Sequence, residues 1–230
     1  MMMKGTFYGI GVGPGDPDLL TLKAVKILHL VDVIAVPESK KEAGSVALEI
    51  AKPHLKSEVE MLTLTFPMIK DEVAKAKIRR DNALQIAEAI EAGKNVAFLT
   101  LGDPMLYSTY IYLLETLVER GIEMVSVPGI YSFSAISNLV NQPLVKGDES
   151  LAVISKFEAS DWADLQSFQT VVCMKVAAYS KVLFETLVEA KEWNFLMVTN
   201  AGKASEVTSR DIADLQLDVP YFSTVVLSKN

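Results

Sequence analysis

The chain has 230 residues, half of them hydrophobic, which is enough for one large core or two small ones and excludes a disordered chain. Its formal net charge of −7 argues against a nucleic-acid partner, because phosphate binding needs a concentrated basic face. The sequence predicts a cytoplasmic protein with no membrane partner. It has a single cysteine and lacks a leader pattern, and every apolar run is interrupted before it reaches the roughly 20 residues that span a bilayer.

Short apolar runs alternate with helical periodicity through the first half of the chain. The expected strands are 7–12, 33–36, 59–66, 95–101 and 122–127, and the expected helices are a segment through Leu22, Val25 and Leu28, then 44–51, 71–92 and 108–119. Such alternation predicts a parallel sheet covered by helices, with ligand loops beyond the carboxyl ends of the strands.

The second half predicts a smaller unit of mixed order. Its expected helices are 131–141 and 181–190, and its expected strands are 151–155, 170–174, 196–199 and a final pair that includes 222–227. We therefore expect an α/β protein of two domains, 1–126 with a mainly parallel sheet and 127–230 with a mixed sheet.

Two loops of the first half have the composition of a ligand site. Residues 9–17 and 99–110 each leave an expected strand through glycine and proline and open onto a helix. Gly102 and Pro104 allow the main chain to approach a ligand, while Asp103 and the free amides supply polar partners. The alternative is that both segments are ordinary strand-to-helix turns.

Several familiar site motifs are missing from the sequence. The glycine run does not satisfy the dinucleotide fingerprint, because Pro14 or Asp16 stands where its last glycine belongs. There is no Gly-Lys-Ser/Thr phosphate loop and no Gly-x-Ser-x-Gly nucleophile elbow. His29 and His54 have no further ligands at recognisable spacing, so no protein metal site is predicted.

The order of five short motifs resembles the tetrapyrrole methylase family, whose members transfer methyl groups from S-adenosylmethionine. The motifs are Gly11-Val-Gly-Pro-Gly-Asp-Pro-Asp-Leu-Leu-Thr21, Leu101-Gly-Asp-Pro104, Val127-Pro-Gly-Ile130, Cys173-Met-Lys175 and Thr199-Asn-Ala201. Within the family, the segments 100–109, 150–155 and 220–224 resemble the branch that methylates precorrin-2 at C-20.

The resemblance implies a homodimer of two-domain chains, with the cofactor folded into a cleft between the halves and a substrate trough in the first half. The implied cofactor contacts are Pro14, Leu101, Gly102, Asp103, Leu106, Tyr131, Ser132, Met174, Asn200 and Ala201. Structural alternatives stay open: Met174 as a core residue, Leu106 as a helix-packing residue and Ser132 as a helix cap.

Asp103 is the candidate catalytic residue, with a cap of the following helix as its structural alternative. The candidate substrate contacts are Tyr107, Ser108, Tyr112 and Lys175, for which core packing or surface hydration is the alternative. Basic pairs such as Lys40–Lys41 and Arg79–Arg80 are typical of solvated surface, but basic side chains in the trough would neutralise substrate carboxylates.

The implied reaction moves a methyl group from a sulfonium to the C-20 meso carbon of precorrin-2 or of its cobalt complex, in cobalamin biosynthesis. Holding both reactants in line can supply roughly 7–11 kcal/mol of barrier reduction, so no strong side-chain nucleophile is needed. The sequence does not assign the base that removes the proton. Another acceptor on the same fold, or a noncatalytic tetrapyrrole- or nucleotide-binding module, are the alternatives.

Overall fold

The protein is described by a computed structural model that covers residues 4–38, 44–67 and 69–229. It divides into two compact units, Met1–Tyr131 and Ser132–Asn230. The first unit ends at Tyr131, whereas the sequence predicted that the first domain ends at residue 126. None of the helices in the described ranges is both long and apolar enough to cross a membrane.

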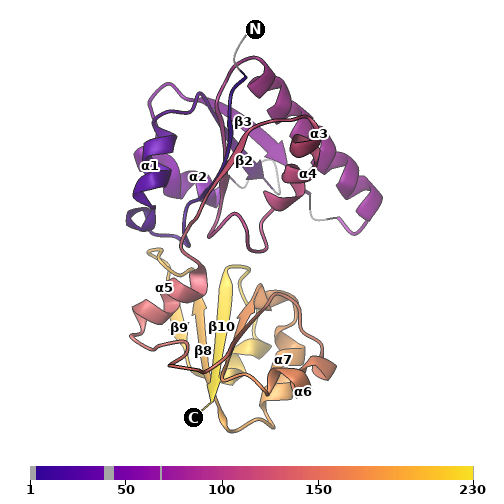
Figure 1. Cartoon of the computed structure of the whole chain (residues 1–230). Coiled ribbons are helices and arrows are strands. Elements are labelled where there is room, and N and C mark those ends of the chain that lie inside the picture. Colours follow the sequence, from indigo (N-terminus) through magenta and orange to yellow (C-terminus); the bar gives the residue numbers. More distant parts are fainter. Residues whose placement is uncertain (1–3, 39–43, 68, 230) are drawn as a thin grey trace. The chain divides into compact units, whose positions relative to one another are not determined.

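The first unit is built on a parallel sheet of five strands in the spatial order β3-β2-β4-β1-β5. Two of these strands, β2 and β3, are labelled in Figure 1. In chain order its elements are β1 (Phe7–Gly11), the 3-10 turn η1 (Pro17–Leu19), α1 (Leu22–Leu28), β2 (Val33–Glu38), α2 (Val46–Ala51), the 3-10 turn η2 (Lys52–His54), β3 (Glu60–Thr65), α3 (Glu72–Glu91), β4 (Val96–Thr100), α4 (Ile111–Glu119) and β5 (Met124–Val127). The parallel sheet expected from the alternating pattern is confirmed.

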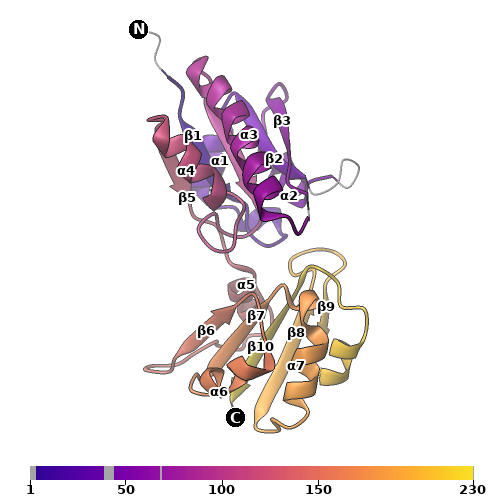
Figure 2. The same ribbon diagram turned by 90° about the vertical axis from the view of Figure 1, so that its right-hand side faces the viewer.

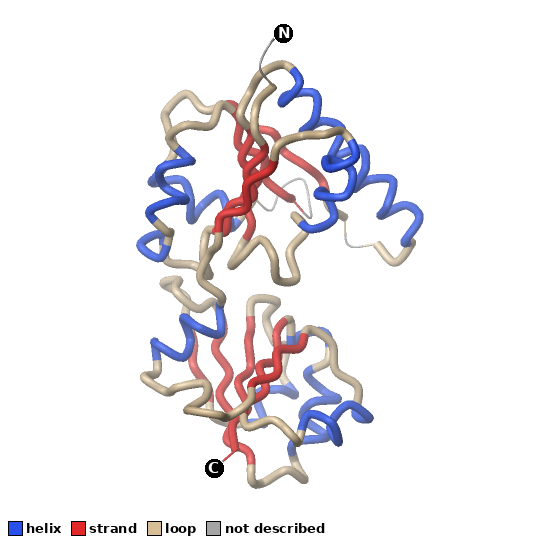
Figure 3. The backbone as a smooth tube through the Cα atoms, viewed as in Figure 1, coloured by secondary structure: helices blue, strands red, loops and turns tan. Residues whose placement is uncertain are grey.

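Both faces of this sheet are covered by helices. The helices α1 and α2 pack on one face, and α3 and α4 lie side by side on the other (Figures 2 and 3). Because it is covered on both sides, the central strand β4 is buried along its whole length. The strand β3 at the edge of the sheet is mostly exposed.

The helix α4 begins later than the sequence predicted. We expected a helix from Ser108, but α4 starts at Ile111. Tyr107 has a left-handed backbone with φ of 52°, which interrupts helical geometry, and the Ser108 hydroxyl accepts a hydrogen bond from the backbone N–H of Tyr110 at 3.1 Å. The residues before Ile111 therefore form a turn that belongs to the loop after β4.

The second unit contains a mixed sheet in the order β6-β7-β10-β8-β9, as expected. Its elements are α5 (Ser132–Leu139), β6 (Leu151–Ile154), the 3-10 turn η3 (Ala159–Asp161), α6 (Trp162–Leu165), β7 (Thr170–Met174), the 3-10 turn η4 (Val176–Ala178), α7 (Ser180–Leu187), β8 (Trp193–Thr199), β9 (Val207–Ser209), the 3-10 turn η5 (Ile212–Gln216) and β10 (Ser223–Lys229). The strands β6 and β7 are parallel, whereas β10 is antiparallel to both β7 and β8. The short strand β9 was not predicted, because most of its side chains are exposed.

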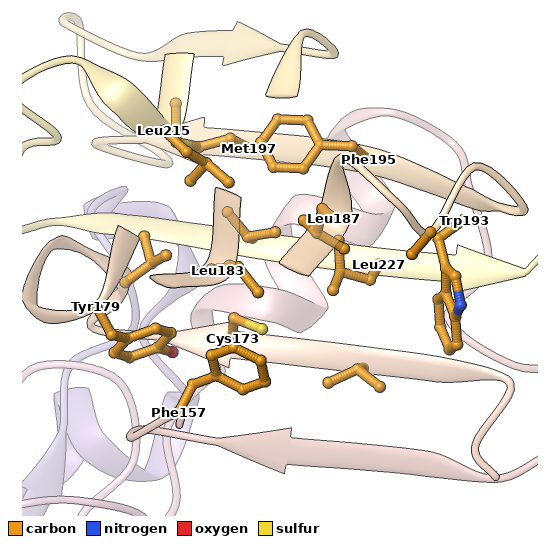
Figure 4. Packing of buried hydrophobic residues seen from close by; sticks show 14 of the residues in the cluster. Phe157, Cys173, Tyr179, Leu183, Leu187, Trp193, Phe195, Met197, Leu215 and Leu227 are labelled. Atoms are coloured by element: carbon orange, nitrogen blue, oxygen red, sulfur yellow. The ribbon is translucent and has the colours of Figure 1, made fainter. Parts of the chain in front are cut away.

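Large apolar side chains fill one face of the second sheet. Figure 4 shows the thiol of Cys173 among Phe157, Tyr179 and Leu183. Burial raises the pKa of this thiol to about 12, although a hydrogen bond with Tyr179 opposes the shift. The one cysteine of the chain is thus a core residue.

We expect Cys173 to resist thiol reagents in the native protein at mildly alkaline pH, because a buried thiol is neither accessible nor ionised. Unfolding in denaturant should expose it. Intact-mass measurement after brief treatment with iodoacetamide reports on this residue alone, since the chain has one cysteine. Native labelling as fast as that of the denatured chain would contradict the described core.

Candidate active site

Three loops meet backbone to backbone at the carboxyl edge of the parallel sheet. Gly13 and Gly102 exchange backbone hydrogen bonds of 2.8 and 3.2 Å. A methyl group added to Gly129 would lie 2.1 Å from the carbonyl oxygen of Gly102, and one added to Gly11 would lie 2.6 Å from the same oxygen. Only glycine permits this approach, so the loops after β1, β4 and β5 form one backbone-lined structure.

The buried carboxylate of Asp103 ties two of these loops together. One oxygen accepts the backbone N–H of Met105 at 2.8 Å, and the other accepts the N–H of Gly129 at 3.0 Å. Asp103 therefore does not cap α4, whose first residue is Ile111. Its position within the loops makes it a positioning residue for the backbone around it, and its direct catalytic role stays a prediction.

The space beside Gly102 is open. Its backbone is left-handed with φ of 71°, and an added side-chain carbon would find only the carbonyl oxygen of Ile130, at 4.0 Å. Of the other predicted contacts in this unit, Pro14 is buried, whereas Leu101, Leu106 and Tyr131 are half-buried. A ligand can therefore approach the main chain at Gly102, between side chains that retain exposed surface.

Tyr131 lies within electrostatic reach of Asp103. Burial raises the pKa of its hydroxyl above the ordinary value, and the negative charge of Asp103 raises it further. The hydroxyl therefore keeps its proton at neutral pH. In that form Tyr131 can donate a hydrogen bond.

The predicted substrate contacts in this unit divide into one internal and two surface residues. The buried Ser108 hydroxyl lies 2.8 Å from that of Thr100, and it also holds the N–H of Tyr110, so it stabilises the turn. Tyr107 and Tyr112 are exposed by 40% and 48%. The guanidinium of Arg79 lies over the ring of Tyr112, 3.7 Å from its centroid. Tyr107 and Tyr112 thus keep surface that solvent reaches.

The second unit presents two strained turns at the ends of β7 and β8. Lys175 follows Met174 and Asn200 follows Thr199, and both Lys175 and Asn200 have left-handed backbones with φ of 55°. The Tyr179 hydroxyl donates to the carbonyl of Met174 at 2.7 Å, and the N–H of Asn200 donates to the carbonyl of Phe222 at 2.9 Å. Non-glycine residues in this conformation are uncommon and concentrate at functional sites.

Two further predicted contacts, Met174 and Ala201, are sequence neighbours of these turns, whereas Ser132 lies at the start of α5. Ala201 is buried and Met174 is half-buried, so Met174 as a core residue and Met174 as a cofactor contact both stay predictions. Ser132 is the first residue of α5, and its hydroxyl lies 3.3 Å from that of Thr224. Burial lowers the pKa of the Lys175 ammonium group.

The predicted cofactor contacts are divided between the two units. The first set comprises Pro14, Leu101, Gly102, Asp103, Leu106 and Tyr131, and the second comprises Ser132, Met174, Asn200 and Ala201. Gly11 and Gly129 belong to the sequence motifs, but no role was predicted for either of them from the sequence. Lys40 and Lys41 lie outside the described residues. Within the described ranges, no three His, Cys, Asp or Glu side chains are placed to hold a metal ion.

Comparison with known proteins identifies the family of this chain. Residues 6–215 match the sequence profile of the tetrapyrrole (corrin/porphyrin) methylases. The chain belongs to the tetrapyrrole methylase family. The family match spans the loops of the first unit and the turns after β7 and β8, so the motif resemblance is confirmed.

Individual members of the family narrow the comparison. The chain is 36% identical to the cobalt-precorrin-2 C(20)-methyltransferase of Salmonella typhimurium, over 99% of this chain and 98% of that protein. It is 42% identical to a probable cobalt-precorrin-2 C(20)-methyltransferase of Methanocaldococcus jannaschii, over 73% of this chain and 71% of that protein. A solved uroporphyrin-III C-methyltransferase of Thermus thermophilus, complexed with S-adenosyl homocysteine, shares the fold with a TM-score of 0.68, 24% identity and 97% coverage of both chains.

Replacing Asp103 by Asn should destabilise the first unit by ~1–3 kcal/mol, because an amide nitrogen cannot accept the N–H of Gly129 or Met105 and leaves a donor unpaired. Urea denaturation measures the change. The matched control is Asp211→Asn, since Asp211 is exposed and accepts a single backbone N–H, from Ala213. We expect the control to change stability by no more than ~0.5 kcal/mol. Equal effects of the two substitutions would contradict the tying role of Asp103.

Proposed function

We propose that this chain transfers a methyl group from S-adenosylmethionine to the C-20 meso carbon of cobalt-precorrin-2 in cobalamin biosynthesis. The observation that carries the proposal is the 36% identity to the Salmonella cobalt-precorrin-2 C(20)-methyltransferase along nearly the whole of both chains. The tetrapyrrole is the substrate, and any cobalt belongs to it. The proposal therefore needs no metal ligands from the protein.

The residues of the first unit suit a ligand that is held largely by main chain. The left-handed Gly102 leaves open space at its α-carbon, and its neighbours Leu101 and Leu106 offer partly exposed apolar surface. When bound, S-adenosylmethionine supplies an electrophilic methyl group on a sulfonium. We propose that Pro14, Leu101, Gly102, Asp103, Leu106 and Tyr131 bind it, with Ser132, Met174, Asn200 and Ala201 from the second unit.

The work of the protein in this reaction is to position the reactants. The contact of Gly11, Gly102 and Gly129, fixed by the two hydrogen bonds of Asp103, leaves little freedom in the loops. Holding two reactants in line contributes roughly 7–11 kcal/mol in favourable cases. Burial and the charge of Asp103 raise the pKa of Tyr131, which favours its neutral, hydrogen-bond-donating form. Tyr107, Tyr112 and Lys175 are the proposed substrate contacts, whereas the buried Ser108 supports the turn that carries Tyr107.

A homodimer and a cytoplasmic location belong to the same proposal. The homodimer is supported by the family resemblance. The location is supported by the single cysteine, which is buried and free rather than part of a disulfide.

Replacing Gly102 by Ala should weaken binding of S-adenosylhomocysteine at least tenfold, because the added methyl group fills the open space where the cofactor is proposed to lie. Calorimetry measures the affinity. The matched control is Gly121→Ala, which has φ of 63° and open space around the new methyl group, and so meets the same backbone penalty of about 1 kcal/mol. We expect the control to bind normally. Normal binding by the Gly102 variant as well would remove Gly102 from the cofactor site.

Supplying cobalt-loaded and metal-free precorrin-2 in parallel, with isotope-labelled methyl donor, tests the acceptor. We expect the label on the C-20 carbon, located by NMR, and faster turnover of the cobalt form. Exclusive turnover of the metal-free form would reject the cobalt assignment, and label on another carbon would reject the branch. Binding of donor and tetrapyrrole without transfer would indicate a noncatalytic module.

A further inference from the structure

The helix α3 places a cation where its buried face predicts an apolar side chain. Ala83, Ile86 and Ile90 are fully buried and pack against the sheet and α4. Arg79 stands four residues before Ala83, so it continues the same helical stripe toward the start of the helix. Arg79 is half-buried there, so its aliphatic stem extends the stripe while its guanidinium stays near the surface.

Arg79 lies toward the edge of the sheet where the ligand loops are. A helix that follows a parallel strand starts at the carboxyl end of that strand, and α3 follows β3 while α4 follows β4. Tyr112 is the second residue of α4, and the Arg79 guanidinium is 3.7 Å from the centroid of its ring. Figure 2 shows the two helices side by side. The Arg79–Tyr112 pair is therefore held near the first turn of α4.

The Arg79 guanidinium keeps its hydrogen-bonding edges for a ligand. Among the described residues none forms an ion pair or a hydrogen bond with it, and its contact with Tyr112 uses the flat face of the group. The nearby acid Glu72 is already paired with Lys75. By contrast, Arg120 on α4 is bound by both carboxylate oxygens of Glu91.

Besides this cation, the first unit carries exposed apolar surface in the loop that leads into α4 and Tyr112. In the loop between β4 and α4, Met105 is 56% exposed and Tyr107 is 40% exposed. A flat apolar ring system that carries carboxylates matches this combination better than a small inorganic anion does, because the latter would leave the apolar groups in water.

We propose that Arg79, stacked on Tyr112, binds a peripheral carboxylate of the tetrapyrrole acceptor and so fixes which edge of the macrocycle faces the methyl donor. This inference rests on the proposed function, since it names a recognition residue of the same site. Arg79 contacts the acceptor through paired N–H groups, and Tyr112, already a proposed substrate contact, also positions the guanidinium through its ring.

The test compares Arg79→Gln with Arg80→Gln, which removes the same charge from the neighbouring, exposed position. We expect Arg79→Gln to weaken acceptor binding about tenfold or more, in an absorbance titration and in KM, while affinity for S-adenosylhomocysteine stays unchanged. Arg80→Gln should leave both affinities unchanged. Tyr112→Leu should weaken acceptor binding less than Arg79→Gln does, and Tyr112→Phe should preserve it.

Three results would overturn the inference. One is unchanged acceptor affinity in Arg79→Gln, another is an equal loss in both arginine variants, and the third is a parallel loss of S-adenosylhomocysteine affinity. If the glutamine variant does not fold, Arg79→Lys keeps the charge but loses the planar fork, and it should still weaken acceptor binding severalfold. A wild-type chain that binds the acceptor through Arg79 but transfers no methyl group would reject the proposed function and keep this inference.

Discussion

The first unit depends on the close approach of three backbones at the carboxyl edge of its parallel sheet. The carbonyl oxygen of Gly102 lies where any side chain on Gly11 or Gly129 would have to go. Asp103 then fixes the arrangement, because its two oxygens accept N–H groups from its own loop and from the loop after β5. The result is a surface formed by main chain, whose shape is set by hydrogen bonds rather than by side-chain rotamers.

Three of the four described non-glycine residues with left-handed backbones follow strands, and the fourth, Asn141, follows α5. Tyr107, Lys175 and Asn200 all have left-handed backbones and all stand in segments that follow a strand. Such a conformation costs roughly 1–2 kcal/mol for a residue with a side chain. Well-packed cores on either side make this tolerable: the strands that lead into these turns, β4, β7 and β8, are almost entirely buried. Rigid strands thus hold sharply turned ends in place.

Charge is arranged locally rather than globally in this acidic chain. The net charge of −7 gives no general attraction to an anionic ligand. Arg79, with its face on Tyr112 and its edges unused by the described residues, provides such attraction at one point. Tyr131, whose hydroxyl pKa is raised by burial and by Asp103, adds a neutral donor in the first unit. A positioning enzyme needs this kind of selective contact more than it needs a reactive side chain.

The sequence by itself determined the α/β class, the parallel sheet of the first half and the mixed sheet of the second, because apolar periodicity reports which faces are buried. It also determined the family, through loop motifs in a fixed order. Local patterns failed where tertiary contacts decide. Ser108 looks like a helix start but bonds to Thr100 and the N–H of Tyr110, and β9 carries too few buried side chains to show a strand pattern.

Only the tertiary structure decided the roles of individual site residues. Asp103 was predicted as a catalytic group or a helix cap, but its partner Gly129 lies on another loop, and a long-range hydrogen bond leaves no trace in local spacing. The sequence predicted Arg79 as a solvated surface charge. Its stacking on Tyr112 could not be predicted, because it requires α3 and α4 to lie side by side. Periodicity encodes burial along one element, whereas a site is made of contacts between elements, and these exist only once the chain has folded.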